Sequence, residues 1–248
     1  MAVPQFSEFE LLLIRSGNEV GTAVLLLLAW IAASDGCIDE EEAESLQSIL
    51  EASSHGHAIE PILKISTSAD LQAIQLAAEV VRIHFTGEKA SLFMQMAIGM
   101  AVADGYLTAS ENYILRFLAD LVGLTAVELN EAFVEVTSKL IPELADPSTA
   151  EWWIAKEQRR QNQNGSHSES NRSQASPSSK ANSERVRALA ILGLEEDASP
   201  EEIKKTYRRL AQVHHPDRFV SLGNEAVAAA SLTFKRIKDA YDYLNGHA

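Results

Sequence analysis

The sequence predicts an all-α protein with two domains of unequal size. Helix-capping motifs recur along the chain, the N-terminal part contains an internal repeat, and a polar segment separates it from a short amphipathic C-terminal part. No segment shows the convincing alternation of a β-strand. We place a helical domain at residues 1–157, a flexible linker at residues 158–183 and a small domain at residues 184–248.

Capping motifs mark the helices of the N-terminal domain. In a capping box, a Ser, Thr or Asp residue at the helix start is followed three positions later by Glu. Segments of this form begin at Asp39, Thr108, Thr125 and Ser148. Together with chain breaks at glycines, they predict roughly seven to nine helices in this domain.

The internal repeat has a period of 69 residues. This shift aligns Asp35-Gly36 with Asp104-Gly105, and it aligns Leu46 with Leu115 and Ile49 with Leu118. Each copy consists of an apolar helix, an Asp-Gly turn and a capped helix. We expect two related helical hairpins packed about a pseudo-twofold axis.

The two repeated turns, AASDGCIDEEE and AVADGYLTASE, resemble the TerB fold named for tellurite-resistance proteins. The resemblance covers about residues 19–136. It implies a compact helical domain and leaves the ligand of that domain open.

The acidic turns raise the question of a metal site. Asp35, Glu42, Asp104 and Glu111 could bring four carboxylates together near the axis, and such a cluster suits Ca²⁺ or Mg²⁺. Neither turn matches an EF-hand loop, however, and Glu42 and Glu111 also fit the third position of a capping box. We favour the capping role, keep a divalent cation as the alternative, and expect no other cofactor.

The segment 158–183 has the composition of a linker. It is rich in Ser, Asn and Gln and has no apolar periodicity. A flexible coil of this length has a root-mean-square reach of roughly 30 Å. The sequence therefore predicts a C-terminal domain that moves freely relative to the N-terminal one.

Three helices are predicted in the C-terminal domain. A short helix containing Val186, Leu189 and Leu192 should end at Gly193. Ser199, with Pro and Glu after it, marks the start of a helix over residues 200–214, which Pro216 must end.

A last helix is predicted over residues 224–244. Its apolar stripe should pack against that of the preceding helix as an antiparallel hairpin. The stripe consists of Ala230, Phe234, Ile237, Tyr241 and Leu244, facing Ile203, Tyr207 and Leu210.

The candidate site follows from this arrangement. His215, Pro216 and Asp217 should lie at a corner between two helices, where both polar side chains are displayed. The other faces of the helix before the corner carry the basic residues Lys204, Lys205, Arg208 and Arg209.

Residues 184–246 resemble a J domain, the module of DnaJ-type co-chaperones. The resemblance rests on Leu192-Gly193-Leu194, Tyr207, Leu210-Ala211, His215-Pro216-Asp217 and the stripe of the last helix. Leu189 replaces the usual aromatic residue, and a fourth helix is missing or vestigial. The C-terminal position and the loop RFVSLGNEA are more similar to the DjlA-like branch, in which a TerB-like domain precedes the J domain.

The resemblance implies a partner and a mechanism. J domains bind an Hsp70 and accelerate its ATP hydrolysis, and the matching residues here are His215, Pro216 and Asp217. The four basic residues could steer an acidic partner, although a basic helix face can also be simply solvated. A plain helix-ending turn is the alternative for the corner, but the matching flanking helices favour the J-domain interpretation.

Composition excludes several other classes of protein. Residues 1–155 hold 6 Lys or Arg against 23 Asp or Glu, so phosphate repels this part and nucleic acid is not an expected partner. The single cysteine, Cys37, suits a reducing compartment, and we expect a cytoplasmic location. The longest apolar run, residues 23–33, is too short to cross a bilayer. His84 lies in an apolar helix and is expected to be buried.

We see no nucleophile with a paired base and no phosphate-binding loop, so we expect no enzymatic activity. The favoured function is therefore an Hsp70 co-chaperone whose acidic domain provides targeting or binds an unknown protein partner. The alternatives are a stress-response adaptor that senses a divalent metal, and a scaffold with an inactive J domain. An exposed apolar face could also support a homodimer or a peripheral membrane contact.

Overall fold

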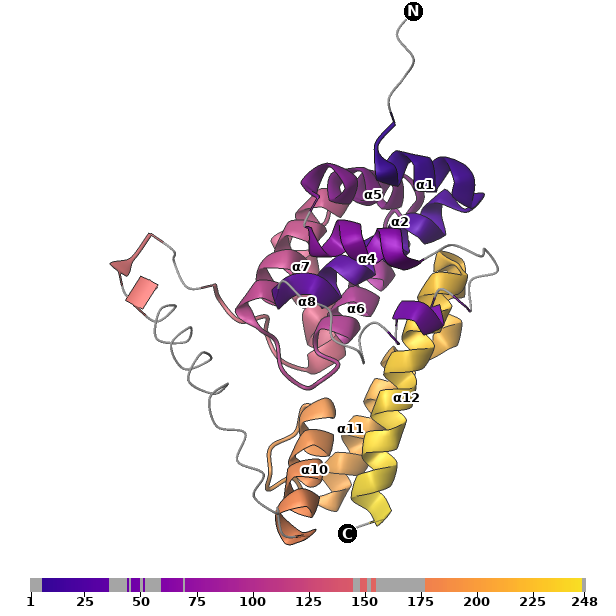
Figure 1. The fold of residues 1–248 in the computed structure, drawn as a ribbon. Helices are drawn as coiled ribbons and strands as arrows, with labels where there is room; N and C mark the ends of the chain where they lie inside the picture. Colours follow the sequence, from indigo (N-terminus) through magenta and orange to yellow (C-terminus); the bar gives the residue numbers. More distant parts are fainter. Residues whose placement is uncertain are drawn as a thin grey trace, which may run out of the picture.

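A computed structural model describes residues 6–35, 44, 46–49, 51, 59–68, 70–144, 148–150, 153–154 and 177–246. Its regular structure is helical and contains no strand within these ranges, which confirms the predicted all-α fold class. The helices form two groups that lie against each other (Figure 1). Across the described ranges, we find no helix with both the length and the apolar character needed to cross a membrane.

The N-terminal group is organised around two central helices, α2 (Glu19–Ala32) and α6 (Glu88–Ala101). Both are apolar on nearly every side and almost completely buried, as expected for helices surrounded by others. The surrounding helices are α1 (Glu8–Ser16), η1 (Ala33–Asp35), α4 (Ile59–Thr67), α5 (Leu71–His84), α7 (Ala109–Val122) and α8 (Ala126–Thr137).

The helix bounds agree with the 69-residue repeat. Both ends of α6 lie 69 residues after the corresponding ends of α2. The aligned pairs Leu46 with Leu115 and Ile49 with Leu118 are all completely buried or nearly so. The repeat therefore reflects equivalent positions in one hydrophobic core.

Two of the predicted capping boxes are present. Thr108 and Thr125 each accept a hydrogen bond from the N–H of the Glu three residues later, and their own N–H groups donate to that Glu side chain at 2.7 Å. Asp39 and the partner of Ser148 lie outside the described residues. A further capping box begins α1 at Ser7 and was not predicted.

His84 corrects one expectation. Its side chain is exposed rather than buried, and Nδ1 lies 2.9 Å from the carbonyl oxygen of Val80. The residue ends α5, where a histidine can interact with the unpaired carbonyl groups of the last turn.

The C-terminal group contains α10 (Pro177–Ile191), α11 (Pro200–Val213), η2 (Pro216–Leu222) and α12 (Asn224–Gly246). The helix α10 begins within the segment expected to be a flexible linker, so residues 177–183 are helical. Pro177 suits the first turn of this helix, because proline is tolerated there. The polar residues that follow it belong to the same helix as the apolar residues at its end. Residues 158–176 of the expected linker lie outside the described residues.

The predicted helical hairpin is present and has a core of its own. Leu189 of α10 and Leu192, just after this helix, pack with Leu210 of α11 and with the second half of α12. The rings of Tyr207 and Tyr241 stack between α11 and α12, with centroids 4.0 Å apart and planes inclined by 10°. Gly193 has a φ of +70° and follows α10, as a helix-ending glycine does.

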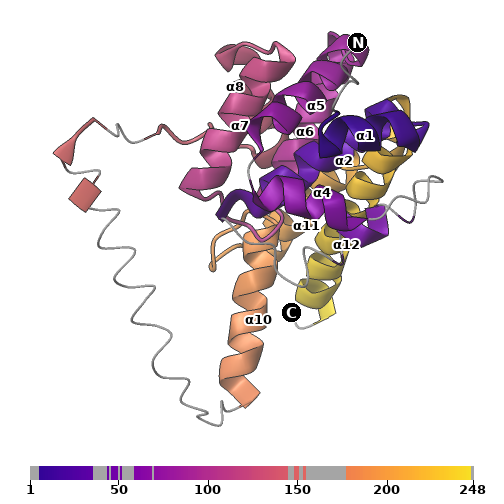
Figure 2. The ribbon, with the colours of Figure 1, turned by 45° about the horizontal axis from the view of Figure 1, so that its top comes forward.

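The first half of α12 has a different environment. Figure 1 and Figure 2 show the helix extending from the C-terminal group to the side of the N-terminal domain. There Ala226, Ala229 and Ala230 belong to the main hydrophobic core, together with Phe219 and Leu222 of η2. Ala230 was expected in the hairpin stripe and instead completes this larger core.

The expected free movement of the C-terminal domain is therefore wrong for this structure. Phe219 and Leu222 of η2 and the small residues of early α12 are buried in the main core, where they meet the surface of α2 and α6. Burial of Phe219 alone contributes on the order of 2 kcal/mol.

Close polar and backbone contacts accompany this packing. Asn18 Nδ2 donates to Glu225 Oε1 at 2.9 Å, and Glu225 is only 4% exposed. Gly21 makes room for that carboxylate, since a Cβ at this position would overlap it. Gly99 in the same way leaves space for the ring of His214.

Gly105, from the second repeated turn, lies directly against the α10 backbone at Ala190. Its φ is +92°, and a Cβ would overlap the Ala190 carbonyl group. The Asp-Gly turn thus forms part of the surface on which the C-terminal domain packs.

We expect Gly105→Ala to destabilise the protein more than Gly123→Ala. Gly123 has a similar φ of +85°, but its Cβ would meet only Arg82 Cδ at 3.8 Å. Both changes should lower the free energy of unfolding by about 1 kcal/mol, because alanine is strained in the left-handed backbone conformation. Gly105→Ala should lower it by roughly 1–3 kcal/mol more, because the new Cβ overlaps α10. Urea denaturation measures the loss of stability in each variant. Equal losses would contradict the close contact between Gly105 and α10.

His214 gives the folded protein a specific pH dependence. It is 3% exposed, and burial followed by repulsion from Arg209 and Arg218 lowers its pKa to about 4 from an ordinary value of 6.5. The unfolded chain therefore binds more protons between these pH values. Stability should fall as the pH drops from about 6.5 towards 4, by roughly 1 kcal/mol per pH unit from this residue.

Urea denaturation between pH 4 and pH 7 tests this dependence. His214→Gln should flatten the slope of the free energy of unfolding against pH. His84→Gln, which changes an exposed histidine, should leave this slope unchanged. The same slope in the wild type and in His214→Gln would rule out this explanation.

Candidate functional site: the His-Pro-Asp corner

The helix α11 is held at both ends by local sequence. Ser199 Oγ accepts from the Glu202 N–H at 3.3 Å, and the Ser199 N–H donates to Glu202 Oε2 at 2.8 Å. The Ser199 hydroxyl also donates to Glu202 Oε2 at 2.7 Å, and this bond, followed by the one from the Ser199 N–H, lowers the pKa of the Glu202 carboxyl. At the other end, His215 has extended backbone angles, because Pro216 excludes the helical conformation there.

The corner displays His215 and Asp217 beside each other. His215 Nδ1 lies 3.6 Å from Asp217 Oδ2, and the two side chains are 50% and 87% exposed. The Asp217 N–H also donates to His215 Nδ1 at 3.3 Å. The pair is therefore positioned by the backbone of η2 while remaining accessible to a partner.

The His215 ring is further oriented by Phe234 of α12. The two rings meet edge to face, with centroids 5.8 Å apart and planes at 81°. Because Nδ1 accepts a backbone N–H, a neutral ring carries its proton on Nε2. The corner thus offers one N–H donor and one carboxylate acceptor.

The four basic residues of α11 divide into two sets. Lys204, Lys205 and Arg208 are exposed and line one shallow depression of the surface. Arg209 is partly buried, and its Nη1 donates to the carbonyl oxygens of Glu135 and Val136 at 2.9 and 3.0 Å. Burial lowers the Arg209 pKa.

These carbonyl groups belong to the last turn of α8, which has no basic residue of its own. Arg209 supplies the positive charge that such a helix end favours. Arg218 adds an ion pair with Glu135 Oε1 at 3.0 Å, and Gln95 Nε2 donates to Glu135 Oε2 at 2.7 Å. Glu135 therefore links both domains.

The candidate metal ligands are placed only in part. Asp104 Oδ1 accepts the Tyr106 N–H at 3.0 Å, and Glu111 Oε2 accepts the Thr108 N–H. The side chain of Asp35 and all of Glu42 lie outside the described residues. Among the side chains that the structure does describe, no three His, Cys, Asp or Glu residues converge, and the cation hypothesis stays a prediction.

The residues that join the domains were not predicted from the sequence. Arg218 follows the corner directly, and His214 precedes it, but neither has a neighbour in sequence that indicates its contacts. Phe219 was a usable signal, because a large aromatic residue in a short loop usually needs a surface to cover it.

Comparison with known proteins agrees with this two-domain structure. Residues 21–133 match the family described as tellurite resistance protein TerB, and residues 188–247 match the DnaJ domain. No solved structure is a significant match.

Several curated proteins are similar to the chain. A co-chaperone protein DjlA of Aliivibrio fischeri is 30% identical over 154 residues, which are 61% of this chain and half of that protein. A co-chaperone protein DjlA of Vibrio vulnificus is 25% identical over 235 residues, 92% of this chain and 77% of that protein. A chaperone protein DnaJ of Xanthomonas axonopodis is 49% identical over 55 residues, 22% of this chain and 13% of that protein.

The alignments thus span half of the first of these relatives and a small part of the DnaJ protein. The TerB match covers α2 to α8, and the DnaJ match begins within α10 and includes the corner. The chain combines an N-terminal TerB domain with a C-terminal DnaJ domain, and over most of its length it is similar to proteins named co-chaperone protein DjlA.

Proposed function

We propose that this protein is a co-chaperone that binds a DnaK-type Hsp70 and stimulates its ATP hydrolysis through His215, Pro216 and Asp217. The observation that carries the proposal is the corner itself, in which an imidazole and a carboxylate lie side by side and exposed at the end of a basic helix. The DnaJ-domain match over the same residues supports it.

In this proposal the chain performs no chemistry of its own. The Hsp70 hydrolyses ATP, and the corner provides a fixed pair of hydrogen-bonding groups that a partner can engage. Phe234 and the η2 backbone hold these groups in place before binding, so little conformational entropy is lost on association.

The basic surface that faces solvent provides the electrostatic part of recognition. Lys204, Lys205 and Arg208 carry charge that attracts an acidic partner and raises the rate of encounter. Arg209 and Arg218 contribute less to this surface, because their guanidinium groups contact α8.

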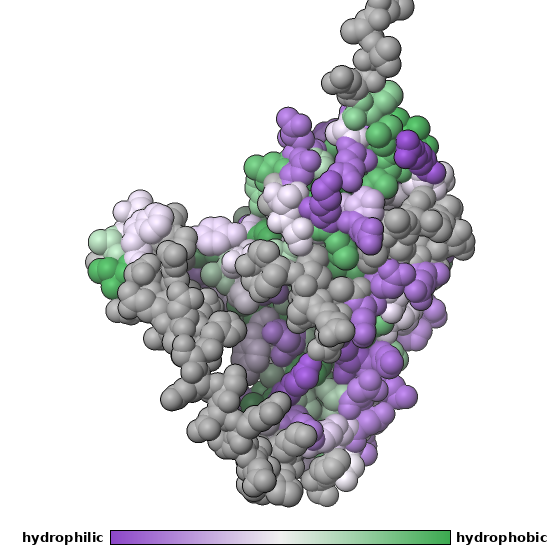
Figure 3. Space-filling view, in the orientation of Figure 1, coloured by the Kyte–Doolittle hydropathy of each residue, from purple (hydrophilic) through white to green (hydrophobic). Residues whose placement is uncertain are grey.

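We assign targeting, or the binding of a further protein, to the N-terminal domain. Residues 1–155 hold 23 acidic against 6 basic residues. Figure 3 shows hydrophobic side chains over α1 at one end of the molecule, whereas hydrophilic side chains cover the outer side of α12. Ile14 of α1 is 62% exposed and contributes to this apolar surface, which we assign as the candidate contact.

His215→Gln should abolish stimulation while leaving the fold intact. Glutamine keeps a polar side chain but lacks the ring that packs on Phe234. The steady-state ATPase rate of a purified DnaK-type Hsp70 should rise with the wild-type protein and stay at its basal level with the variant. His84→Gln is the matched control and should stimulate like the wild type. Equal stimulation by His215→Gln would refute the assigned role of the corner.

Neutralising the exposed basic residues should weaken binding mainly through the association rate. The triple variant Lys204→Gln, Lys205→Gln, Arg208→Gln should associate with the Hsp70 about tenfold more slowly at low salt. The difference should shrink as ionic strength rises. Lys235→Gln with Lys238→Gln, two exposed lysines of α12, is the control in surface plasmon resonance. A salt-independent difference would contradict electrostatic steering.

A further inference from the structure

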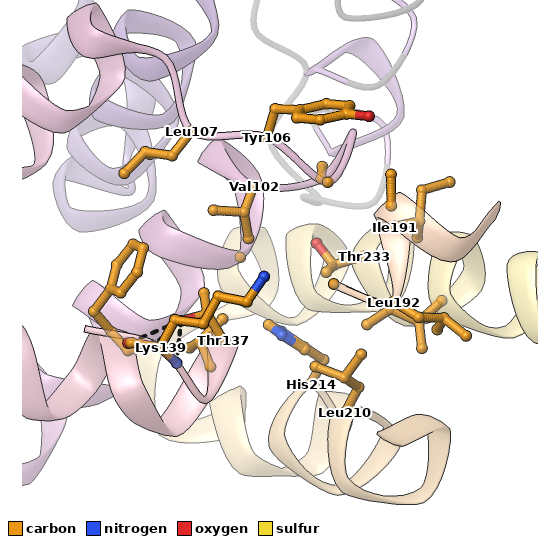
Figure 4. Close-up of a pocket in the computed structure, with 18 of the residues that line it drawn as sticks. Val102, Tyr106, Leu107, Thr137, Lys139, Ile191, Leu192, Leu210, His214 and Thr233 are labelled. Atoms are coloured by element: carbon orange, nitrogen blue, oxygen red, sulfur yellow. Dashed lines mark hydrogen bonds between the residues drawn. The ribbon is translucent and has the colours of Figure 1, made fainter. Parts of the chain in front are cut away.

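A cavity of about 260 Å³ lies between the two domains. The N-terminal domain contributes the turn after α6, the end of α8 and the segment that follows α8 (Figure 4). The C-terminal domain contributes the ends of α10 and α11 and the middle of α12. At roughly 30 Å³ per molecule in the liquid, the space would hold about nine waters. It is thus large enough for a ligand of about ten non-hydrogen atoms.

Most of the lining is apolar. Val102, Leu107 and Phe133 contribute from the N-terminal domain, and Leu192, Leu210 and Ile237 contribute from the C-terminal domain. Water in such a space would find few hydrogen-bonding partners. The walls therefore favour a ligand with an apolar body.

The charged groups of the lining are all basic. Lys139 and Arg209 lie in the wall with His214 and Arg236, and no Asp or Glu of the described residues lines the cavity. Within the described part of the chain, the Lys139 amine makes neither a hydrogen bond nor an ion pair. Figure 4 shows this amine and the His214 ring entering the cavity from opposite domains.

His214 is the second indication of a ligand. The residue is only 3% exposed, its ring lines the cavity, and the ring nitrogens have no hydrogen-bond partner among the residues that the structure describes. Buried polar groups normally have a partner. An imidazole held against Gly99 and directed into a cavity can donate to an anion placed there.

We propose that the cavity binds a small carboxylic acid with an apolar body, its carboxylate placed between Lys139 and His214. A phosphate fits less well, because its additional charge and oxygens would need more donors than the apolar walls provide. Although His214 immediately precedes the corner, binding of a ligand at this site does not require an Hsp70. Since both domains contribute to the walls, the ligand binds the packed arrangement and stabilises it.

Isothermal titration calorimetry of the full chain with decanoate, below its micelle concentration, tests the site. Decanoate should bind, whereas decanol, which has the same chain without the charge, should bind about tenfold more weakly. Inorganic phosphate should not bind.

Variants of the two polar groups complete the test. Lys139→Gln and His214→Leu should each weaken decanoate binding about tenfold, and Lys139→Arg should largely preserve it. Lys89→Gln, which removes another exposed lysine of the same domain, is the control and should bind like the wild type. Absence of binding to the wild type, or wild-type affinity in both Lys139→Gln and His214→Leu, overturns the proposal.

Discussion

The double burial of α12 is the constraint on which the rest of the structure depends. Its first half completes the core of the N-terminal domain, and its second half completes the core of the helical hairpin. Small side chains at Ala226, Ala229 and Ala230 allow the close approach to the central helices. Since one continuous helix belongs to both cores, neither domain buries all its apolar surface without the other.

The contacts around α8 explain why one side of the basic helix packs in the protein while the other faces solvent. The carbonyl groups at the end of α8 and the Glu135 carboxylate attract Arg209 and Arg218. These contacts orient α11 so that Lys204, Lys205 and Arg208 face solvent. The same helix therefore serves as an interdomain contact on one side and as a charged surface on the other.

Local sequence rules predicted the elements well, because capping, proline and periodicity act over a few residues. The Thr108 and Ser199 caps and the turn before Pro216 all followed from such rules. Packing between the domains could not be predicted in this way. An alanine such as Ala230 fits a hairpin stripe and a second core equally well, and a polar linker gives no information about the surfaces that it connects.

The shared helix also has a geometric meaning. A flexible tether determines how often two bound molecules meet, whereas a rigid helix determines the angle and the separation at which they meet. With 23 residues, α12 is about 35 Å long. The His215 corner consequently keeps one direction relative to the N-terminal helices, so molecules bound at the two ends would be held at a set angle and separation.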